Sequence, residues 1–485
     1  MSPETSQLVQ RLWKLCNLLK DDGVNYSQYV NELTYLLFIK MAWERELHLG
    51  ASASWDELLE CPEGRILRTY ESALRSMASV DSAMIRQIFK DARSEVQRPS
   101  TLRLLITAID KFEWFDPSIE AFGDLYEGLL EKNSIEAKSG AGQYFTPRPI
   151  VDSMVALMKP RRSDVIQDPA AGTGGFLVAA HNYIISHSRP GTWSKASKRR
   201  YLEATFFGLE HVRDTQRLAM MNLYLHGLDS AESPAGVQLG DSLSNDIATL
   251  PRPTLILSNP PFGVKGGGGR PDRDDLPFTT SNKQLSFLQH SYTTLRPGGR
   301  AAIIVPDNVL FGGKIGRAIR SDLMEKCNLH TILRLPTGLF YAAGVQTNVI
   351  FFSKGEGGEG NTEETWVYDL RHGMPMFGRR RPFLRDELRG FEAAFGEDPS
   401  GGREALILRA RDCTDPRFKR FPRELVRRGD DSLDVGLWNI GSEAPPSPPS
   451  AVSSARQVVR LLEEAIREAS SLLASLEESE GRRGG

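Results

Sequence analysis

The sequence predicts a doubly wound α/β domain with a mostly parallel, seven-stranded sheet, an all-α domain before it and a helical tail after it. Three observations lead to this fold class. Apolar residues recur at helical spacing over residues 1–137, where Pro and Gly are sparse. Short β-branched runs alternate with helical patterns over residues 138–374. A heptad pattern then occupies residues 455–485, after a polar linker.

The N-terminal region, residues 1–137, is expected to form a helical domain. Its apolar side chains recur three or four residues apart, at Leu8, Leu12, Leu15, Leu19, Tyr29, Leu33, Leu37 and Met41. Residues 35–43 are apolar enough to form a core helix. We expect this domain to contribute packing and no chemistry of its own.

The central region, residues 138–374, carries the strand pattern. The seven predicted strands are residues 165–167, 206–209, 237–239, 255–257, 301–305, 331–333 and 348–352. Short apolar runs that alternate with helices indicate βαβ units and a parallel sheet covered on both faces. A further strand-like piece, residues 366–370, follows a Gly/Glu-rich loop.

The C-terminal region divides into three predicted segments. Residues 375–441 are expected to be irregular and Arg-rich, and residues 442–454 form a Pro/Ser-rich linker. In residues 455–485, apolar positions alternate three and four apart, at Ala455, Val458, Leu462, Ala465, Ala469, Leu472 and Leu476. This coiled-coil-like seam needs another helix to cover it.

Composition excludes several classes of protein. The chain of 485 residues has 60 Lys and Arg against 62 Asp and Glu, so it does not hold nucleic acid by bulk charge alone. A local basic face or a partner subunit remains open. The four cysteines are far apart, so we expect neither a disulfide framework nor a metal site. Without a signal-like or membrane-spanning stretch, the expected location is cytoplasmic, with no membrane contact.

A glycine-rich turn follows the first predicted strand, in residues 168–176 (DPAAGTGGF). Ligands bind at the carboxyl ends of strands in open α/β sheets, and glycines let the backbone approach them closely. Neither the phosphate-binding Walker pattern nor G-x-G-x-x-G is present. Asp168, Glu210 and Asp241 end three successive strands, which favours an adenosine-containing ligand. The alternatives are a tight turn without a ligand and solvated loop acids.

Residues 258–262, Ser-Asn-Pro-Pro-Phe, follow the fourth predicted strand. Two prolines fix a rigid turn, in which the Asn259 side-chain oxygen and the Pro260 carbonyl are positioned to accept from one NH₂ group. Phe262 offers a face for a stacked base. This arrangement favours methylation of an exocyclic amine, in which two acceptors localise the nitrogen lone pair and positioning replaces a strong base. A purely structural turn is the alternative.

Three motifs together resemble a known family. GAGQYFTPRP (140–149), DPAAGTGGF (168–176) and SNPPFG (258–263) are similar to the modification (methylase, HsdM) subunits of type I restriction–modification systems. Further similar stretches lie at residues 280–290, 295–311, 333–352 and 431–439. The resemblance covers nearly the whole chain, including the helical N-terminal domain. The resemblance implies an S-adenosylmethionine-dependent methyltransferase sheet and methyl transfer to N6 of adenine in DNA.

The resemblance also implies the site residues. Those for the target amine and base are Asn259, Pro260, Pro261 and Phe262. Those for S-adenosylmethionine are Gln143, Tyr144, Phe145, Thr146, Pro147, Arg148, Asp168, Thr173, Gly174, Gly175, Glu210 and Asp241. Two other functions stay open: methylation of protein glutamine or RNA, and a non-catalytic scaffold that binds the cofactor.

The partners implied by the resemblance are double-stranded DNA, a specificity subunit that reads the sequence, and an ATP-driven restriction subunit. Two modification subunits would join one specificity subunit, and methylation would protect host DNA from the cognate restriction activity. We hypothesise that residues 455–485 dock on the specificity subunit; packing on their own chain is the alternative.

The glycine-rich segment 263–275 directly follows Phe262. We hypothesise that it orders when DNA enters, with Lys265, Arg270 and Arg273 near phosphates. A disordered surface insertion is the alternative.

Overall fold

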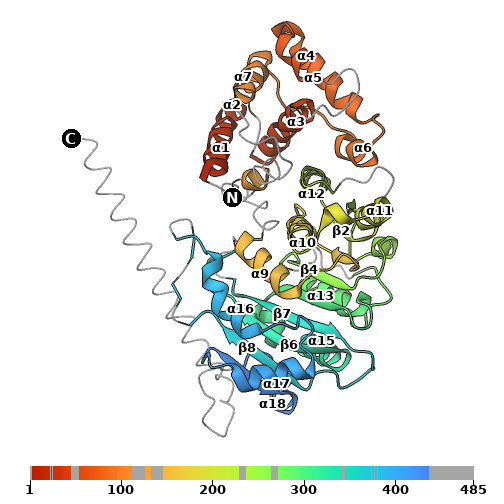
Figure 1. The fold of residues 1–485 in the computed structure, drawn as a ribbon, viewed down its shortest axis with the longest axis vertical. Coiled ribbons are helices and arrows are strands. Elements are labelled where there is room, and N and C mark those ends of the chain that lie inside the picture. Colours follow the sequence, from red (N-terminus) through yellow and green to blue (C-terminus); the bar gives the residue numbers. More distant parts are fainter. Residues whose placement is uncertain are drawn as a thin grey trace, which may run out of the picture. The chain divides into compact units, whose positions relative to one another are not determined.

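The computed structural model divides into two compact units, Met1–Asp434 and Val435–Gly485. It describes residues 3–21, 23, 26–44, 54–111, 126–130, 132, 146–228, 236–263, 271–340, 345–372, 374–375, 377–378 and 381–435. The predicted linker 442–454 and the predicted heptad helix 455–485 therefore lie outside the described residues. Everything that follows concerns the first unit (Figure 1).

The described part of the N-terminal region is helical, with helices α1 (Pro3–Lys14), α2 (Cys16–Asp21), α3 (Tyr26–Glu44), α4 (Trp55–Glu60), α5 (Glu63–Met77), α6 (Ala83–Phe89) and α7 (Pro99–Asp110). Helix α3 is the core helix, with Leu33, Leu36 and Ile39 buried. Lys40 on the same helix bonds Asp110 at the end of α7, with 3.0 Å between nitrogen and oxygen.

The described strands form one nine-stranded sheet in the order β3-β2-β1-β4-β5-β7-β6-β8-β9. They are β1 (Ile166–Asp168), β2 (Phe206–Glu210), β3 (Gly236–Leu239), β4 (Leu255–Ser258), β5 (Arg300–Pro306), β6 (Cys327–Arg334), β7 (Thr347–Lys354), β8 (Glu364–Asp369) and β9 (Phe418–Pro422). Strand β7 runs antiparallel between β5 and β6, and β9 runs antiparallel to β8. The other pairs are parallel, which confirms the predicted α/β class.

Two predictions about the sheet need correction. It has nine described strands rather than seven, because β8 and β9 extend it beyond β6. The predicted irregular segment 375–441 contains β9 and the helices α16 (Arg389–Phe395), α17 (Arg403–Asp412) and α18 (Arg423–Arg428). Strand β9 buries only Phe418 and Phe421, with half-buried Lys419 and exposed Arg420 between them. With only one fully buried side chain on each face, this edge strand does not read as an apolar run.

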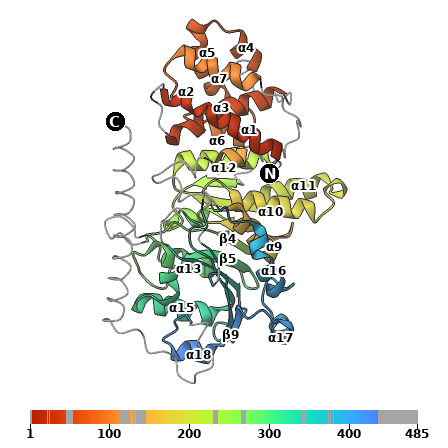
Figure 2. The same ribbon diagram turned by 90° about the vertical axis from the view of Figure 1, so that its left-hand side faces the viewer.

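Helices cover both faces of the sheet. Figure 2 shows α9 (Arg148–Met158) and α10 (Gly175–Ser186) on one side, and α13 (Lys283–Thr294) and α15 (Lys314–Lys326) on the other. The remaining elements are α11 (Lys195–Ala204), α12 (Arg213–Leu225), α14 (Asp307–Phe311) and the 3₁₀ helices η2 (Pro190–Thr192), η3 (Asn245–Thr249) and η5 (Arg385–Leu388). Among the described helices, none has the length and apolar character needed to cross a lipid bilayer.

Helix α12 joins the N-terminal helices to the sheet domain. Its Arg217 donates from Nε to the Ile88 carbonyl at 2.9 Å and from Nη2 to the Lys90 carbonyl at 3.1 Å. Phe38 of α3 contacts Tyr224 of α12, with 5.1 Å between ring centroids. The helical region thus packs directly on the layer that covers the first strands.

The strand order brings several chain segments to one edge of the sheet. Strand β1 lies between β2 and β4, and all three run parallel. The chain winds outward from this point in both directions, which is where open α/β sheets leave a crevice for ligands. The carboxyl ends of β1, β2 and β4 carry Asp168, Glu210 and Ser258.

Candidate functional site

The turn between β1 and α10 is shaped by two glycines. Gly172 has a φ of 54° and Gly174 a φ of 80°, in the left-handed region that glycine adopts without strain. The amide of Ala171 donates to the Leu209 carbonyl at 2.9 Å, so the turn leans over the end of β2. The turn thus lies at the crevice beside β1 and β2.

Asp168 ends β1 and is almost fully buried. Its Oδ1 accepts hydrogen bonds from the Ser258 hydroxyl at 2.7 Å and from the Ala170 amide at 3.0 Å. Burial raises the pKa of Asp168 to about 7, the two hydrogen bonds oppose that rise, and the negative charge of Glu210 adds to it. This carboxyl group therefore changes its charge close to neutral pH.

Glu210 ends β2 and is buried beside the same turn. Its Oε2 accepts from the Gly172 amide at 3.0 Å, and its Oε1 accepts from the Val212 amide at 2.8 Å. Burial raises the pKa of Glu210, while these backbone amides lower it. Because a carboxylate oxygen can accept more than one hydrogen bond, both oxygens keep capacity for a ligand.

Asp241 follows β3 and is half-buried. Its Oδ1 accepts from the Leu243 amide at 2.9 Å, and its own amide donates to Asp246. The third predicted acid therefore sits in a turn held by local hydrogen bonds.

Asn259 follows β4 and has one satisfied and one unsatisfied polar atom. Its Nδ2 donates to the Thr146 hydroxyl at 3.0 Å. Its Oδ1 is buried and has no hydrogen-bond partner within the part of the chain that the structure describes. A buried acceptor left unsatisfied costs about 1–3 kcal/mol. This cost is removed when a ligand supplies an N–H or O–H donor.

The aromatic ring of Phe262 lies three residues further along and is half-buried. It packs against the ring of Phe340, with 6.1 Å between centroids and an interplanar angle of 81°. In the preceding residue, the Pro261 carbonyl accepts from Gln284 Nε2 at 3.3 Å. The turn is therefore held from the side of α13 as well as by its prolines.

These groups surround one cavity of about 750 Å³. The predicted site residues that line it are Thr146, Arg148, Asp168, Thr173, Gly175, Glu210, Asp241, Asn259, Pro261 and Phe262. Pro147, Gly174 and Pro260 are described but do not line it. Gln143, Tyr144 and Phe145 lie outside the described residues.

Arg148 is held by acids at the cavity wall. Its Nη1 lies 2.6 Å from a carboxylate oxygen of Glu127, and its Nε lies 3.0 Å from Asp152. Burial raises the pKa of Asp152, and the positive charge of Arg148 opposes that rise. The Arg148 guanidinium thus joins residues 126–130, which contain Glu127, to helix α9, which contains Asp152.

The sequence did not predict one wall of the cavity. Pro382, Phe383 and Leu384 line it, although they lie in the segment expected to be irregular. Phe383 is buried and packs edge-to-face on Phe377, with 5.0 Å between ring centroids. Nothing in this short stretch distinguishes it from a surface loop.

The hypothesis that Arg273 lies near DNA phosphates is wrong. Its side chain is only 1% exposed, and it forms an ion pair with Asp275. Its Nη1 donates to the Ser242 carbonyl at 2.9 Å and lies 2.7 Å from His290 Nδ1. These partners occupy the guanidinium inside the protein. Lys265 and Arg270 lie outside the described residues.

Comparison with known proteins agrees with this arrangement. The family model described as N-6 DNA Methylase matches residues 117–411. The type I restriction enzyme EcoKI methylase subunit of Escherichia coli (strain K12) is 41% identical over 482 residues, covering 91% of this chain and 90% of that protein. The type I restriction enzyme StySPI methylase subunit of Salmonella potsdam has the same identity and coverage.

Solved structures give the same result. The crystal structure of the EcoKI M protein matches with a TM-score of 0.56 and 36% identity, covering 97% of this chain and 96% of that one. A chain from a study of complex assembly and conformational transition of the type I R-M system matches with a TM-score of 0.70 and 26% identity, covering 97% and 98%.

The chain therefore belongs to the N-6 DNA methylase family, and within it to the methylase subunits of type I restriction enzymes. The predicted family and the predicted enzyme class, an adenine-specific DNA methyltransferase, are confirmed.

Proposed function

We propose that this chain is the methylation subunit of a type I restriction–modification complex. It transfers a methyl group from S-adenosylmethionine to N6 of an adenine flipped out of double-stranded DNA. A separate specificity subunit recognises the DNA sequence, and the modification protects host DNA from the cognate restriction activity. The observation that carries the proposal is the buried, unsatisfied Oδ1 of Asn259 beside a cavity that also holds Asp168 and Glu210.

The residues around the cavity fit S-adenosylmethionine. The Glu210 carboxylate is the acceptor for ribose hydroxyls, and Asp168 offers a negative charge to a cationic or amine-bearing part of the ligand. The turn at Thr173, Gly174 and Gly175 leaves room for the ligand beside the backbone. When bound, S-adenosylmethionine supplies a methyl group activated by a positively charged sulfur. The further residues proposed for this site are Gln143, Tyr144, Phe145, Thr146, Pro147, Arg148 and Asp241.

The target amine is held by acceptors rather than deprotonated by a base. Asn259 Oδ1 accepts from one hydrogen of the adenine amino group, and the Pro260 carbonyl accepts from the other. Both interactions draw the nitrogen lone pair out of conjugation with the ring and aim it at the methyl group. Thr146 fixes the amide of Asn259 so that its oxygen, not its nitrogen, faces the amine. Preorganised acceptors of this kind need no reorganisation during the reaction.

Phe262 provides the stacking face for the flipped base. Extruding a base from a duplex costs a few kcal/mol. Stacking on an aromatic side chain returns about 1–3 kcal/mol of that cost. The rigid turn at Pro260 and Pro261 keeps the ring and the amine acceptors in fixed relation.

The proposed partners follow from charge and from the relatives. A net charge of −2 leaves the chain without the excess of cations that DNA binding usually requires. We therefore assign sequence reading and much of the DNA contact to a specificity subunit, with two methylation subunits for each copy. A restriction subunit completes the larger complex. Docking through residues 455–485 stays a prediction.

The proposal is tested by methyl transfer from labelled S-adenosylmethionine to unmethylated plasmid DNA. The chain is assayed with and without a specificity subunit, and the DNA is digested to nucleosides for mass spectrometry. N6-methyladenine is expected at one specific DNA sequence, and only with the specificity subunit. Label in another nucleoside, in RNA or in a glutamine-containing peptide would refute it, as would cofactor binding without any transfer.

The raised pKa of Asp168 predicts pH-dependent cofactor binding. Below pH 7 the carboxyl group is protonated and has no charge to offer a cation. Affinity for S-adenosylmethionine should therefore rise about tenfold between pH 6 and pH 8, with release of a proton on binding. Titration calorimetry in buffers of different ionisation enthalpy measures both quantities.

The control for this prediction is Asp168→Asn, which keeps the size of the side chain and removes its titration. Its affinity should be weaker at pH 8, and the part of the pH dependence due to Asp168 should disappear. An unchanged slope in the variant would contradict the assignment of the charge to Asp168.

A further inference from the structure

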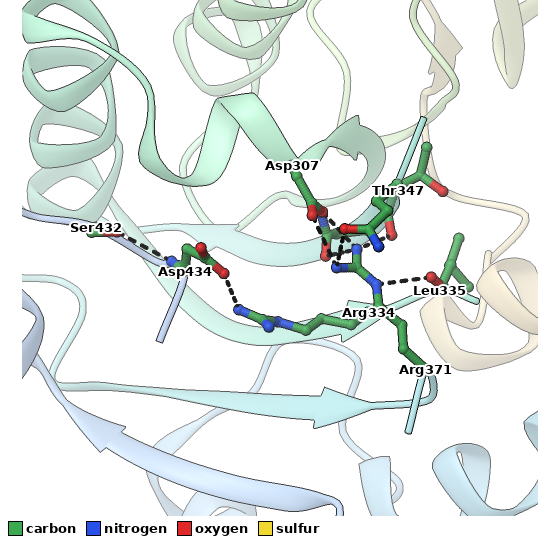
Figure 3. Close-up of polar contacts among 9 residues, drawn as sticks. Asp307, Arg334, Leu335, Thr347, Arg371, Ser432 and Asp434 are labelled. Carbon is green, nitrogen blue, oxygen red and sulfur yellow. Dashed lines mark hydrogen bonds and ion pairs between the residues drawn. The ribbon is translucent and has the colours of Figure 1, made fainter. Parts of the chain in front are cut away.

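Arg371 and Asp307 form an ion pair (Figure 3). It lies at the same edge of the sheet as the cavity, and neither residue lines the cavity. Arg371 follows β8, and Asp307 follows β5. The guanidinium bonds both carboxylate oxygens, with Nη2 at 2.6 Å from Oδ1 and Nη1 at 2.9 Å from Oδ2. The two side chains are 17% and 22% exposed, so the pair is largely shielded from water.

The remaining donors of Arg371 reach two more strands. Its Nε donates to the Leu335 carbonyl just after β6 at 3.0 Å, and Nη2 donates to the Thr347 carbonyl at the start of β7 at 2.9 Å. Asn348 of β7 donates from Nδ2 to Asp307 at 2.8 Å. One guanidinium thus joins the ends of β5, β6 and β8 to the beginning of β7, and it closes both ends of the β6–β7 connection.

The first segment held by this ion pair, residues 335–340, contacts Phe262. Residues 335–340 follow β6, and Phe340 packs edge-on against the ring of Phe262. Phe262 lines the cavity and Phe340 does not, so Phe340 contacts this ring from outside the cavity lining. The orientation of the Phe262 ring therefore depends on where residues 335–340 are held.

The second segment, which follows Arg371 beyond β8, contains Phe383 of the cavity wall. The Phe377 amide, beyond β8, donates to the Thr337 carbonyl at 3.3 Å and so joins the two segments. Phe377 then supports Phe383, which lines the cavity. Phe340 and Phe377, the two rings that pack against cavity-lining residues, therefore both follow strand ends that Arg371 holds.

We propose that Arg371 and Asp307 are positioning residues for methyl transfer. Their ion pair fixes the segment 335–340, and through Phe340 it fixes the plane of Phe262 on which the target base stacks. This inference rests on the proposed function. A displacement of about 1 Å at reacting groups lowers rates by up to about 10²-fold, so a small shift of this support has a measurable effect.

The test is a double-mutant cycle with Arg371→Lys and Phe340→Leu, each in the complex with the specificity subunit. Lysine keeps the charge but cannot bond Asp307, Leu335 and Thr347 together. At saturating DNA and cofactor, Arg371→Lys should slow single-turnover methyl transfer about tenfold. The affinity for S-adenosylmethionine should stay within about twofold. The double variant should be no slower than the slower single variant, because both changes remove the same support.

The matched control is Arg417→Lys. Arg417 forms a similar two-bond pair with Asp415, at 3.0 and 2.7 Å, and does not touch the β6–β7 connection. The Arg417→Lys variant should transfer methyl groups at the wild-type rate. Asp307→Asn weakens the proposed pair from the other side and should reproduce the loss if Arg371→Lys fails to fold.

Three results would overturn the inference: a normal rate in both Arg371→Lys and Asp307→Asn, losses that multiply in the double variant, or a parallel fall in cofactor affinity. Methyl transfer by the wild-type complex distinguishes a failure of this inference from a failure of the proposed function. If it transfers no methyl group to DNA, the function is wrong; if it is active and the variants behave as wild type, only the positioning role is wrong.

Discussion

Replacing Asn259 with alanine should lower the rate of methyl transfer by about 10²–10³-fold, the usual effect of removing one preorganised hydrogen-bonding group from a reacting centre. The substitution removes the buried Oδ1 that we assign to the target amine. It leaves Asp168 and Glu210 in place, because Asn259 bonds Thr146, whereas the two acids are held by Ser258 and by backbone amides. Cofactor affinity should therefore change by less than about twofold.

Single-turnover transfer and titration calorimetry with S-adenosylmethionine measure the two quantities separately. The matched control is Asn328→Ala, which removes an asparagine of β6 that donates to the Gly401 carbonyl and does not line the cavity. It should transfer methyl groups normally. If Asn259→Ala instead lost cofactor binding, the assignment of Asn259 to the amine would be wrong.

Replacing Glu210 with alanine should weaken S-adenosylmethionine binding by about 10²–10⁴-fold. Hydrogen bonds to a charged group contribute about 1.5–3 kcal/mol each, and we assign two of them to the ribose. The change also removes the acceptor for the Gly172 and Val212 amides, which hold the glycine turn. Both effects act on the cofactor, so the effect on DNA affinity of the complex should be small.

Calorimetry with S-adenosylmethionine measures this loss, and thermal unfolding without cofactor reports how far the turn itself is destabilised. Glu203→Ala on α11 is a suitable control, because it removes an acid that pairs with Arg199 and does not line the cavity. Unchanged cofactor affinity in Glu210→Ala would mean that the ribose is held elsewhere.

The sequence predicted the central strands well because burial on both faces makes them continuous apolar runs. The predicted fourth and fifth strands, residues 255–257 and 301–305, fall inside β4 (Leu255–Ser258) and β5 (Arg300–Pro306). The strand ends then located Asp168, Glu210 and Asn259, which the structure places around one cavity. The apolar pattern of each strand was enough to predict this site, because the carboxyl ends of parallel strands lie at the same edge of the sheet.

Other features depend on contacts between distant segments, which the pattern of a short stretch does not contain. Strand β9 is recognisable only once β8 offers it an edge, and Phe383 reaches the cavity from a segment more than 200 residues beyond the glycine turn. Arg273 shows the same limit for charge. An arginine in a glycine-rich loop is expected to be exposed, but the Arg273 side chain is buried and bonds Asp275, Ser242 and His290.

The reversed direction of β7 has a consequence for how this scaffold can diversify. Because β7 runs opposite to its neighbours, β6 ends and β7 begins at the same edge of the sheet, the edge at which the cavity lies. Phe340 in the link between β6 and β7 packs against Phe262, so insertions or deletions there would shift a ring that lines the cavity, while the strand pairing of the sheet is kept. Engineering a new substrate preference should start with this hairpin-like link, whose ends are already clamped.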